Sequence, residues 1–232
     1  MKKSVWISLS VILLSILVPG CQVVMADAYY DTMPQVQYYN PPHERWADPD
    51  NISIGISGLP EDKSIPENKS TFRIYKKAIK AWNKTGVVHL KYDPHDNMPD
   101  IDCGSQRFAA VHKIDPKISS DWLGYTWRST RDGHPGYKGR NLLVYGEVTI
   151  DPTLIKKCAN RYHMNYKKLE LSVAEHEIGH ALGLDHVKQH DHSVMTPVVD
   201  KASLITKEDV QHLRELYSNP VKTDVPDVGT PI

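Results

Sequence analysis

Apolar and polar residues alternate in a short stretch near residue 50. Ile52, Ile54 and Ile56 are separated by serine or glycine, and this period of two is typical of a half-buried β-strand. Further strands are expected at 87–90 and 142–150, with weaker candidates at Ile101, 108–111 and 124–127. The pattern therefore predicts a sheet of several short strands.

Apolar residues recur every three or four positions in two other stretches, as they do on a helix that is packed along one side. The first helix is expected to begin at Ser70 and to end at Gly86, with an apolar face of Phe72, Tyr75, Ile79 and Trp82. The second covers 207–217, near the C-terminus, and has a stripe of Val210, Leu213 and Tyr217.

The clearest helix of the chain covers residues 166–182. One face carries Leu169, Val173, His176 and His180, and apolar residues also cover other directions, so this helix is expected to be buried on most sides. Gly183 is placed to end it. The order of elements predicts an α/β (α+β) fold with a mixed, mainly parallel twisted sheet, this buried helix and a C-terminal helix.

Length and composition indicate one domain of ordinary size with extensions. The chain has 232 residues, of which 40% are apolar, and its 28 basic residues balance 28 acidic ones. This balance argues against a nucleic-acid partner, and a monomer is expected. We expect a signal peptide at 1–20, a linker or short pro-segment at 21–45, a folded domain at 46–217 and a disordered tail at 218–232.

The N-terminus has the form of a secretory signal, because two lysines precede an apolar run at 5–18 that is too short for a confident membrane span. Residues 17–21 resemble a bacterial lipobox, in which Cys21 is lipidated and anchors the mature chain to a membrane. The alternative is an ordinary signal-peptidase site at residues 24–26, which ends in the small residue Ala26. Cleavage after Ala26 would release a soluble protein. Either way an extracellular protein is expected, held at the cell surface or secreted.

Lipidation of Cys21 would leave Cys103 and Cys158, which are the right number for one disulfide. Two separate buried thiols are an equal alternative, and the sequence leaves this open.

The candidate chemistry lies at the end of the buried helix, where residues 176–186 read HExxHxxGxxH. His176 and His180 are four residues apart on a helix, so both imidazoles can bind one metal ion. Gly183 lets the chain turn so that His186 can return as a third ligand. Three imidazoles with an open fourth position are typical of a catalytic zinc site, and Glu177 can reach a water there as general base.

Two other ligand sets are consistent with proximity along the chain. His190 or His192 could replace His186, although neither has the same spacing from Gly183. Glu208 could supply a carboxylate from the C-terminal helix, but His186 already completes the set.

With these residues in view, the sequence resembles the metzincin superfamily of zinc peptidases and, within it, the matrixin family. Metzincins have a methionine turn beneath the metal, and Met195 lies at the expected place after His186, as an apolar floor and not a ligand. Pro197 follows as in the matrixin pattern Met-x-Pro. The resemblance covers about residues 46–217 and implies a zinc-dependent endopeptidase with Zn²⁺ as cofactor and a protein or peptide as substrate.

The sequence departs from animal matrixins in the segment before the domain. Animal matrixins block their zinc with a cysteine of that segment, and here there is no cysteine between Cys21 and Cys103. An aspartate such as Asp27 or Asp31 could cause latency instead.

Other family features are also altered. The second zinc motif and the calcium loops are not recognisable between 103 and 150, so calcium is left open. His112 and His134 could belong to a vestige of these motifs, but positions in exposed loops are expected. The wall tyrosine after the methionine turn is replaced by Val199, which implies a differently shaped specificity pocket.

The resemblance and the motif imply the same reaction, in which Glu177 accepts a proton from the attacking water and delivers it to the leaving amine. An extended substrate is expected to pair with a sheet edge at 123–127, by analogy with the family. Two alternatives use the same residues: a surface binding module without hydrolysis, and cleavage of cell-wall cross-peptides.

Overall fold

The computed structural model describes residues 26–27, 44–58, 66–107, 121–136, 140–187, 193–197 and 202–218. Several predictions lie outside these ranges: the signal peptide with Cys21, the strand at 108–111, the C-terminal tail, and the residues Asp31, His112, His190, His192 and Val199.

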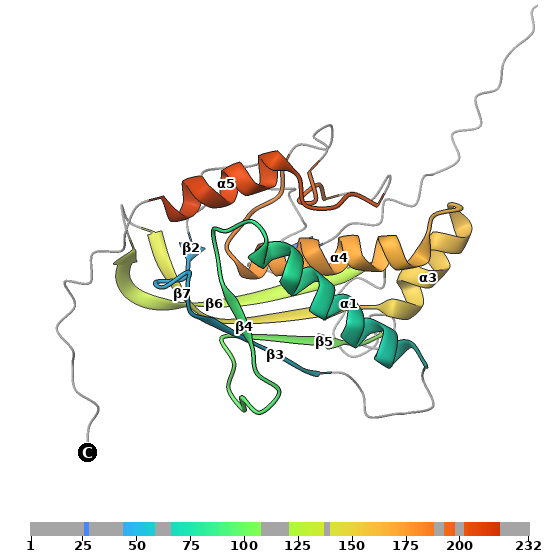
Figure 1. Ribbon diagram of the computed structural model, residues 1–232, viewed down its shortest axis with the longest axis horizontal. Coiled ribbons are helices and arrows are strands. Elements are labelled where there is room, and N and C mark those ends of the chain that lie inside the picture. Colours follow the sequence, from blue (N-terminus) through green and yellow to red (C-terminus); the bar gives the residue numbers. More distant parts are fainter. Residues whose placement is uncertain are drawn as a thin grey trace, which may run out of the picture.

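Within the described residues, seven strands form one sheet that is mainly parallel, as predicted (Figure 1). The order along the sheet is β1-β6-β7-β5-β3-β4, and β2 also pairs with β7. Among the strand pairs that the structure describes, only β6–β7 is antiparallel. The strands are β1 (Ala26–Asp27), β2 (Glu44–Arg45), β3 (Ile52–Gly58), β4 (Leu90–Tyr92), β5 (Ile101–Ser105), β6 (Gly124–Gly136) and β7 (Arg140–Ile150).

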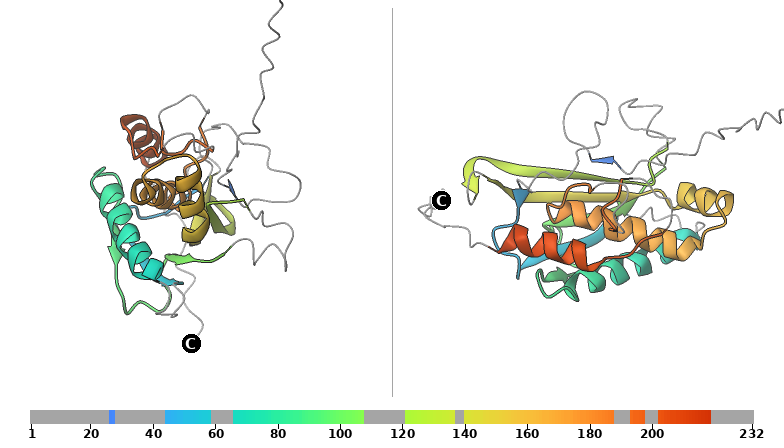
Figure 2. Two further views of the ribbon diagram at one scale, coloured as in Figure 1. Left: turned by 90° about the vertical axis from the view of Figure 1, so that its right-hand side faces the viewer. Right: turned by 90° about the horizontal axis from the view of Figure 1, so that it is seen from above.

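Four helices accompany the sheet in this part of the chain: α1 (Pro66–Asn83), α3 (Pro152–Arg161), α4 (Tyr166–Ala181) and α5 (Lys207–Tyr217). Helices α1 and α4 lie side by side on one face of the sheet, and α3 lies at one end beside the start of α4 (Figures 1 and 2). The long helix α1 runs across the front of Figure 1 and α5 across its top. None of these helices has the length and apolarity needed to cross a membrane.

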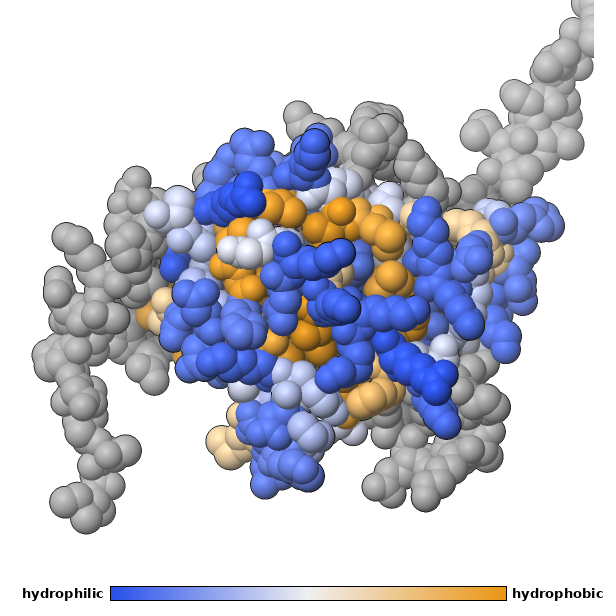
Figure 3. All heavy atoms as spheres, in the orientation of Figure 1, coloured by the Kyte–Doolittle hydropathy of each residue, from blue (hydrophilic) through white to orange (hydrophobic). Residues whose placement is uncertain are grey.

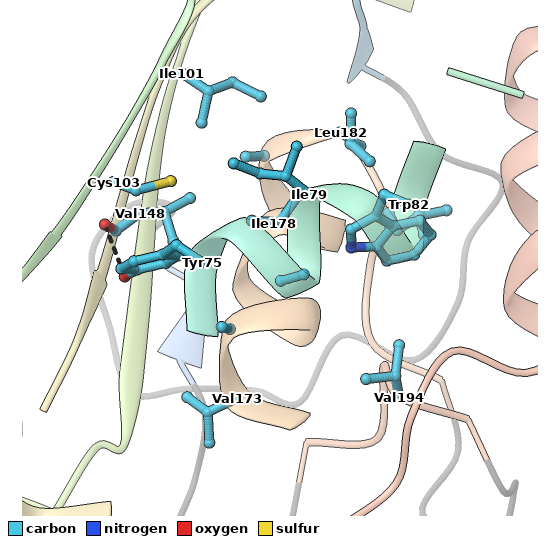
Figure 4. Close-up of a cluster of buried hydrophobic side chains, with 14 of the residues drawn as sticks. Tyr75, Ile79, Trp82, Ile101, Cys103, Val148, Val173, Ile178, Leu182 and Val194 are labelled. Carbon is cyan, nitrogen blue, oxygen red and sulfur yellow. Dashed lines mark hydrogen bonds between the residues drawn. The ribbon is translucent and has the colours of Figure 1, made fainter. Parts of the chain in front are cut away.

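The hydrophobic core lies between the helices and the sheet, and Figure 4 shows part of it, including Val148 from β7 and Ile178 from α4. Two large side chains of α1 are fully buried there with their polar atoms bonded. The Tyr75 hydroxyl donates to the Gly104 carbonyl over 2.6 Å, and Trp82 Nε1 donates to the Glu175 carbonyl over 2.9 Å. These bonds join α1 to β5 and to α4, so α1 helps to fix the position of α4 on the sheet.

Helix α1 begins at Pro66, earlier than the expected Ser70. Tyr75, Ile79 and Trp82 are buried as predicted, but Phe72 is 36% exposed, which corrects its assignment to the buried face. Phe72 lies at the margin of that face, where its ring meets Tyr92 of β4 edge-on at 6.1 Å between centroids. In Figure 3 hydrophilic side chains cover much of this side of the molecule, and apolar ones show between them.

The predicted strand at 87–90 starts later, because β4 begins at Leu90. The preceding residue bonds to the start of β3 and to the loop before it: the His89 amide donates to the Pro49 carbonyl over 2.7 Å, and the His89 carbonyl accepts from the Ile52 amide. The predicted strands at 52–56, at Ile101 and at 142–150 are confirmed. The candidate at 124–127 is the start of the long strand β6, whose pairing with β7 continues to Gly136, so the expectation of a loop at His134 was wrong.

Helix α3 was not predicted, because Asp151-Pro152 also suits the end of a strand. Here Asp151 is the N-cap, whose side chain accepts from the Leu154 amide over 2.9 Å, and Pro152 occupies the first turn. Helix α4 confirms the predicted buried helix. Helix α5 has the predicted bounds, and of the predicted stripe Leu213 is buried and Tyr217 packs against the core. Val210 is only half-buried, and Leu216 takes its place in the core.

Cys103 and Cys158 are both buried and are not bonded to each other. Of the two alternatives, the structure therefore has the two separate thiols, and burial raises the pKa of the Cys103 thiol well above its ordinary value.

Candidate active site

Three histidines converge at the end of α4. His176 and His180 project from the same side of the helix, and His186 approaches from the turn that follows it. Their Nε2 atoms lie 2.8 Å apart for His176–His180, 3.2 Å for His180–His186 and 3.3 Å for His176–His186. All three are buried, and among the described residues they form the one group suited to hold a metal ion.

In two of these rings, the hydrogen bond made by Nδ1 determines whether Nε2 carries a proton. His176 Nδ1 lies 2.7 Å from the Val194 carbonyl oxygen, and His180 Nδ1 lies 2.8 Å from that of Leu184. A carbonyl oxygen only accepts, so each Nδ1 carries the proton and each Nε2 presents a lone pair to the centre. Lone pairs that face one another without a proton between them repel, and a shared cation removes this repulsion.

The spacing fits zinc. Two imidazole nitrogens at about 2.0–2.1 Å from one tetrahedral zinc ion are about 3.3 Å apart, close to two of the three separations observed. The backbone carbonyls behind the rings are the usual outer partners that fix the orientation of ligating histidines. The three residues therefore could hold a metal ion, and a neutral nitrogen donor set suits zinc.

The turn that returns His186 depends on Gly183, as predicted. Gly183 has φ +97°, a conformation that residues with a Cβ rarely adopt, and its amide donates to the His180 carbonyl over 2.8 Å. The Leu184 amide donates to the Gly179 carbonyl over 3.0 Å. A Cβ on Gly183 would also come 2.2 Å from the carbonyl oxygen of Glu44, so β2 packs directly on the turn.

Met195 lies under the active-site helix, as the motif indicates. Its side chain is buried, and a Cβ on Gly179 would come 2.5 Å from its sulfur, so the glycine between the two helical histidines allows this close approach. Pro197 is also buried and follows in the same turn. The Met195 carbonyl accepts from the Val187 amide over 3.1 Å, which joins the turn to the chain just after His186.

The methionine turn is held by a buried carboxylate, that of Asp209, which sequence reasoning missed. Asp209 of α5 accepts from the Ser193 hydroxyl and, over 3.1 Å, from the Val194 amide. The Thr206 amide donates to it over 2.7 Å. Since Val194 also accepts from His176, Asp209 is one residue removed from a candidate metal ligand. The capping box between Thr206 and Asp209 was its only signal in the sequence.

Glu177 is buried beside the histidines and is oriented by β6. The Thr126 hydroxyl lies 2.7 Å from Glu177 Oε2 and 2.9 Å from the Glu177 carbonyl oxygen. Gly124 leaves room for the same side chain, since a Cβ there would come 2.3 Å from Oε1. Sequence reasoning did not identify Thr126, because no pattern along the chain shows which strand residue will face a helix.

The rival ligand Glu208 is exposed at the start of α5 and does not belong to the histidine group. A different glutamate, Glu175, is buried, and burial raises its pKa to about 7 although the Ile205 amide bonds to it. Its carboxylate ties α4 to the segment before α5, so its role in the structure is to hold these elements together.

The fold and the site together define a zinc metallopeptidase. A helix on one face of a mainly parallel sheet carries two histidines, a glycine turn after it brings in the third histidine, and a methionine turn packs against the helix. The matrixin family model matches residues 45–218, and the chain belongs to the matrixin family of zinc-dependent metalloendopeptidases. No curated protein matches the chain.

Proposed function

We propose that this endopeptidase binds its zinc through His176, His180 and His186 and uses Glu177 as the general base. The observation that carries the proposal is the convergence of three buried Nε2 atoms next to a glutamate whose carboxylate is held by Thr126. The protein or peptide substrate follows from membership of the matrixin family.

Zinc at such a site supplies Lewis-acid chemistry, which lowers the pKa of a water and polarises the scissile carbonyl. Glu177 accepts a proton from that water while the water oxygen forms a bond to the carbonyl carbon. The same carboxyl group then gives the proton to the amide nitrogen as the carbon–nitrogen bond breaks. Thr126 keeps the carboxylate in place through both transfers, because its hydroxyl donates to Oε2.

An extended substrate would lie along β6. In the sheet order β6 is followed only by the two-residue strand β1, so most of its length is not paired on that side within the described residues. Leu123 to Trp127 is the stretch nearest to Glu177, since it contains both Gly124 and Thr126. A substrate strand added there would place its peptide bonds beside the general base.

The segment before the domain would then restrain activity. Strand β1 pairs in parallel with β6, with Ala26 opposite Tyr125 and Asp27 opposite Thr126. It therefore occupies the stretch of β6 that a substrate strand would use, and this supports latency caused by residues 21–45. The aspartate at 27 lies opposite the residue that holds Glu177.

We also propose that the protein acts outside the cell, anchored through a lipid on Cys21 or released by cleavage after Ala26. This proposal is supported by the sequence of the N-terminus alone. Metabolic labelling with a fatty acid, comparing the natural chain with Cys21→Ser, distinguishes anchoring from release.

Cleavage of a mixed peptide library tests the function. Chelator-sensitive cleavage is expected, and Glu177→Gln should keep zinc while kcat falls about 10²-fold or more. The matched control is Glu208→Gln, which also removes a glutamate charge, at an exposed position, and should leave both unchanged. Near-normal turnover by zinc-loaded Glu177→Gln would refute the general base. A zinc-loaded natural chain that cleaves no library peptide, even without residues 21–43, would favour a narrow cell-wall substrate or a binding role.

A further inference from the structure

Arg128 of β6 reaches the end of α4 and the turn that follows it. Its Nη1 donates to the His180 carbonyl oxygen over 3.0 Å, and its Nη2 lies 3.5 Å from Asp185 Oδ1. Its Nε lies 3.3 Å from Oε2 of Glu44 in β2. Each guanidinium nitrogen therefore has a different partner, one in β2 and two on either side of the turn after α4.

Two of these partners lie at opposite ends of the turn between the second and third histidines. His180 supplies one imidazole, and Asp185 comes immediately before His186. The glycine conformation at Gly183 reverses the chain between them. A group that holds both His180 and Asp185 fixes the span across which His186 must return.

The contacts are also matched in charge. The last carbonyls of a helix carry partial negative charge, so a cation is favourable beside His180. Two carboxylates, from Asp185 and Glu44, flank the same cation. The Arg128 side chain is only 12% exposed, so water would replace its bonds poorly if it were removed.

Lysine could not reproduce this arrangement. Arginine holds its nitrogens in a rigid plane and can face one hydrogen-bond acceptor and two carboxylates at once, whereas lysine places a single compact charge on a flexible stem. A lysine here would keep the charge but not the geometry that joins His180 to Asp185.

We propose that Arg128 is a positioning residue, which sets the place of His186 relative to His176 and His180 and thereby the affinity for the metal. The inference rests on the proposed function only in that the three histidines bind zinc. Thr126 lies two residues earlier on the same face of β6 and holds Glu177. One strand would then align both the general base and the third ligand.

The test measures zinc affinity in the full chain carrying Glu177→Gln, so that no self-cleavage interferes. Arg128→Met, Arg128→Lys and Asp185→Asn are compared by competition with a chromogenic zinc chelator, together with the melting temperature of each zinc-free protein. Arg73→Met is the control, because this arginine is exposed on α1. Arg128→Met should raise the zinc Kd about 10- to 100-fold, as outer-shell substitutions do.

The variants separate positioning from mere stability. Arg128→Lys should recover only part of the affinity, and combining Arg128→Met with Asp185→Asn should raise Kd by less than the product of the single effects. A lower melting temperature with an unchanged zinc Kd would overturn the inference. If Arg128→Met does not fold, Asp185→Asn decides, since it keeps the shape of the turn; an unchanged Kd overturns the inference. Failure of the parent protein to bind zinc would instead overturn the proposed function.

Discussion

The Thr126 hydroxyl reaches two oxygens of Glu177, the carboxylate Oε2 at 2.7 Å and the backbone carbonyl at 2.9 Å. Both residues are buried, so the contact is made away from bulk water. It joins the strand along which a substrate would lie to the helix that carries the proposed general base. The alignment of Glu177 with a substrate bond is therefore set by the same strand that would hold the substrate.

Replacement of Thr126 by valine should lower kcat about tenfold, because a hydrogen bond to a charged group contributes about 1.5–3 kcal/mol and part of this aligns the carboxylate. KM and zinc content should change little, since neither the edge of β6 nor the histidines lose a group. Steady-state kinetics and metal analysis of purified protein check this. Thr126→Ser, which keeps the hydroxyl, should retain most of the rate, and an equal loss in both variants would contradict the assigned role.

Gly183→Ala should destabilise both the fold and the metal site. Alanine at φ +97° is strained by about 1–2 kcal/mol, and its Cβ would come 2.2 Å from the Glu44 carbonyl oxygen, which is backbone and cannot move aside cheaply. Urea unfolding and zinc titration measure the two effects. Gly86→Ala is a matched control, because Gly86 has φ +67° but nothing within 4 Å of its Cβ position. It should show the strain alone, with normal zinc affinity.

Asp209→Asn should lower the free energy of unfolding by about 2–4 kcal/mol, since a buried acceptor of several hydrogen bonds loses an oxygen and gains a donor. Asp209 accepts from Ser193, Val194 and Thr206, so the amide would meet hydrogens on at least one side. Chemical denaturation of zinc-free protein gives the value. Asp50→Asn, at an exposed position, should change stability by less than about 0.5 kcal/mol. Equal effects of the two substitutions would refute the special role of Asp209.

The spacing of residues along the chain was enough to predict the parts of the site that lie on one helix and its turn. His176 and His180 share a side because they are four residues apart, and Gly183 ends the helix because its backbone must take a positive φ. These are local properties, so no knowledge of distant contacts was needed. For the same reason the bounds of α5 were predicted, and those of α4 to within one residue.

The partners of these residues could not be predicted, because they depend on how distant elements meet. Thr126 and Arg128 reach Glu177 and His180 only because β6 lies along α4 at one position, and local sequence patterns do not reveal where a strand will meet a distant helix. The sequence around Asp209 predicts only a capping box at the start of α5, and it gives no sign of the bonds from Asp209 to the methionine turn. Phe72 shows the converse, since helical periodicity placed it on the buried face while the neighbouring elements do not cover it fully.

Removal of residues 21–43 should raise kcat/KM about tenfold, if β1 competes with substrate for the edge of β6. A segment tethered to the domain competes at an effective concentration near the millimolar range, so even a two-residue pairing can restrain the enzyme. Asp27→Pro tests the pairing within the full chain, because proline cannot donate to a strand ladder, and it should raise kcat/KM in the same direction. Asp27→Ala keeps the backbone: activation by this variant as well would assign latency to the carboxylate, whereas an unchanged rate would assign it to the strand. The measurement is hydrolysis of a fluorogenic peptide by zinc-loaded protein, and equal rates for the full chain and the shortened one would exclude latency of either kind.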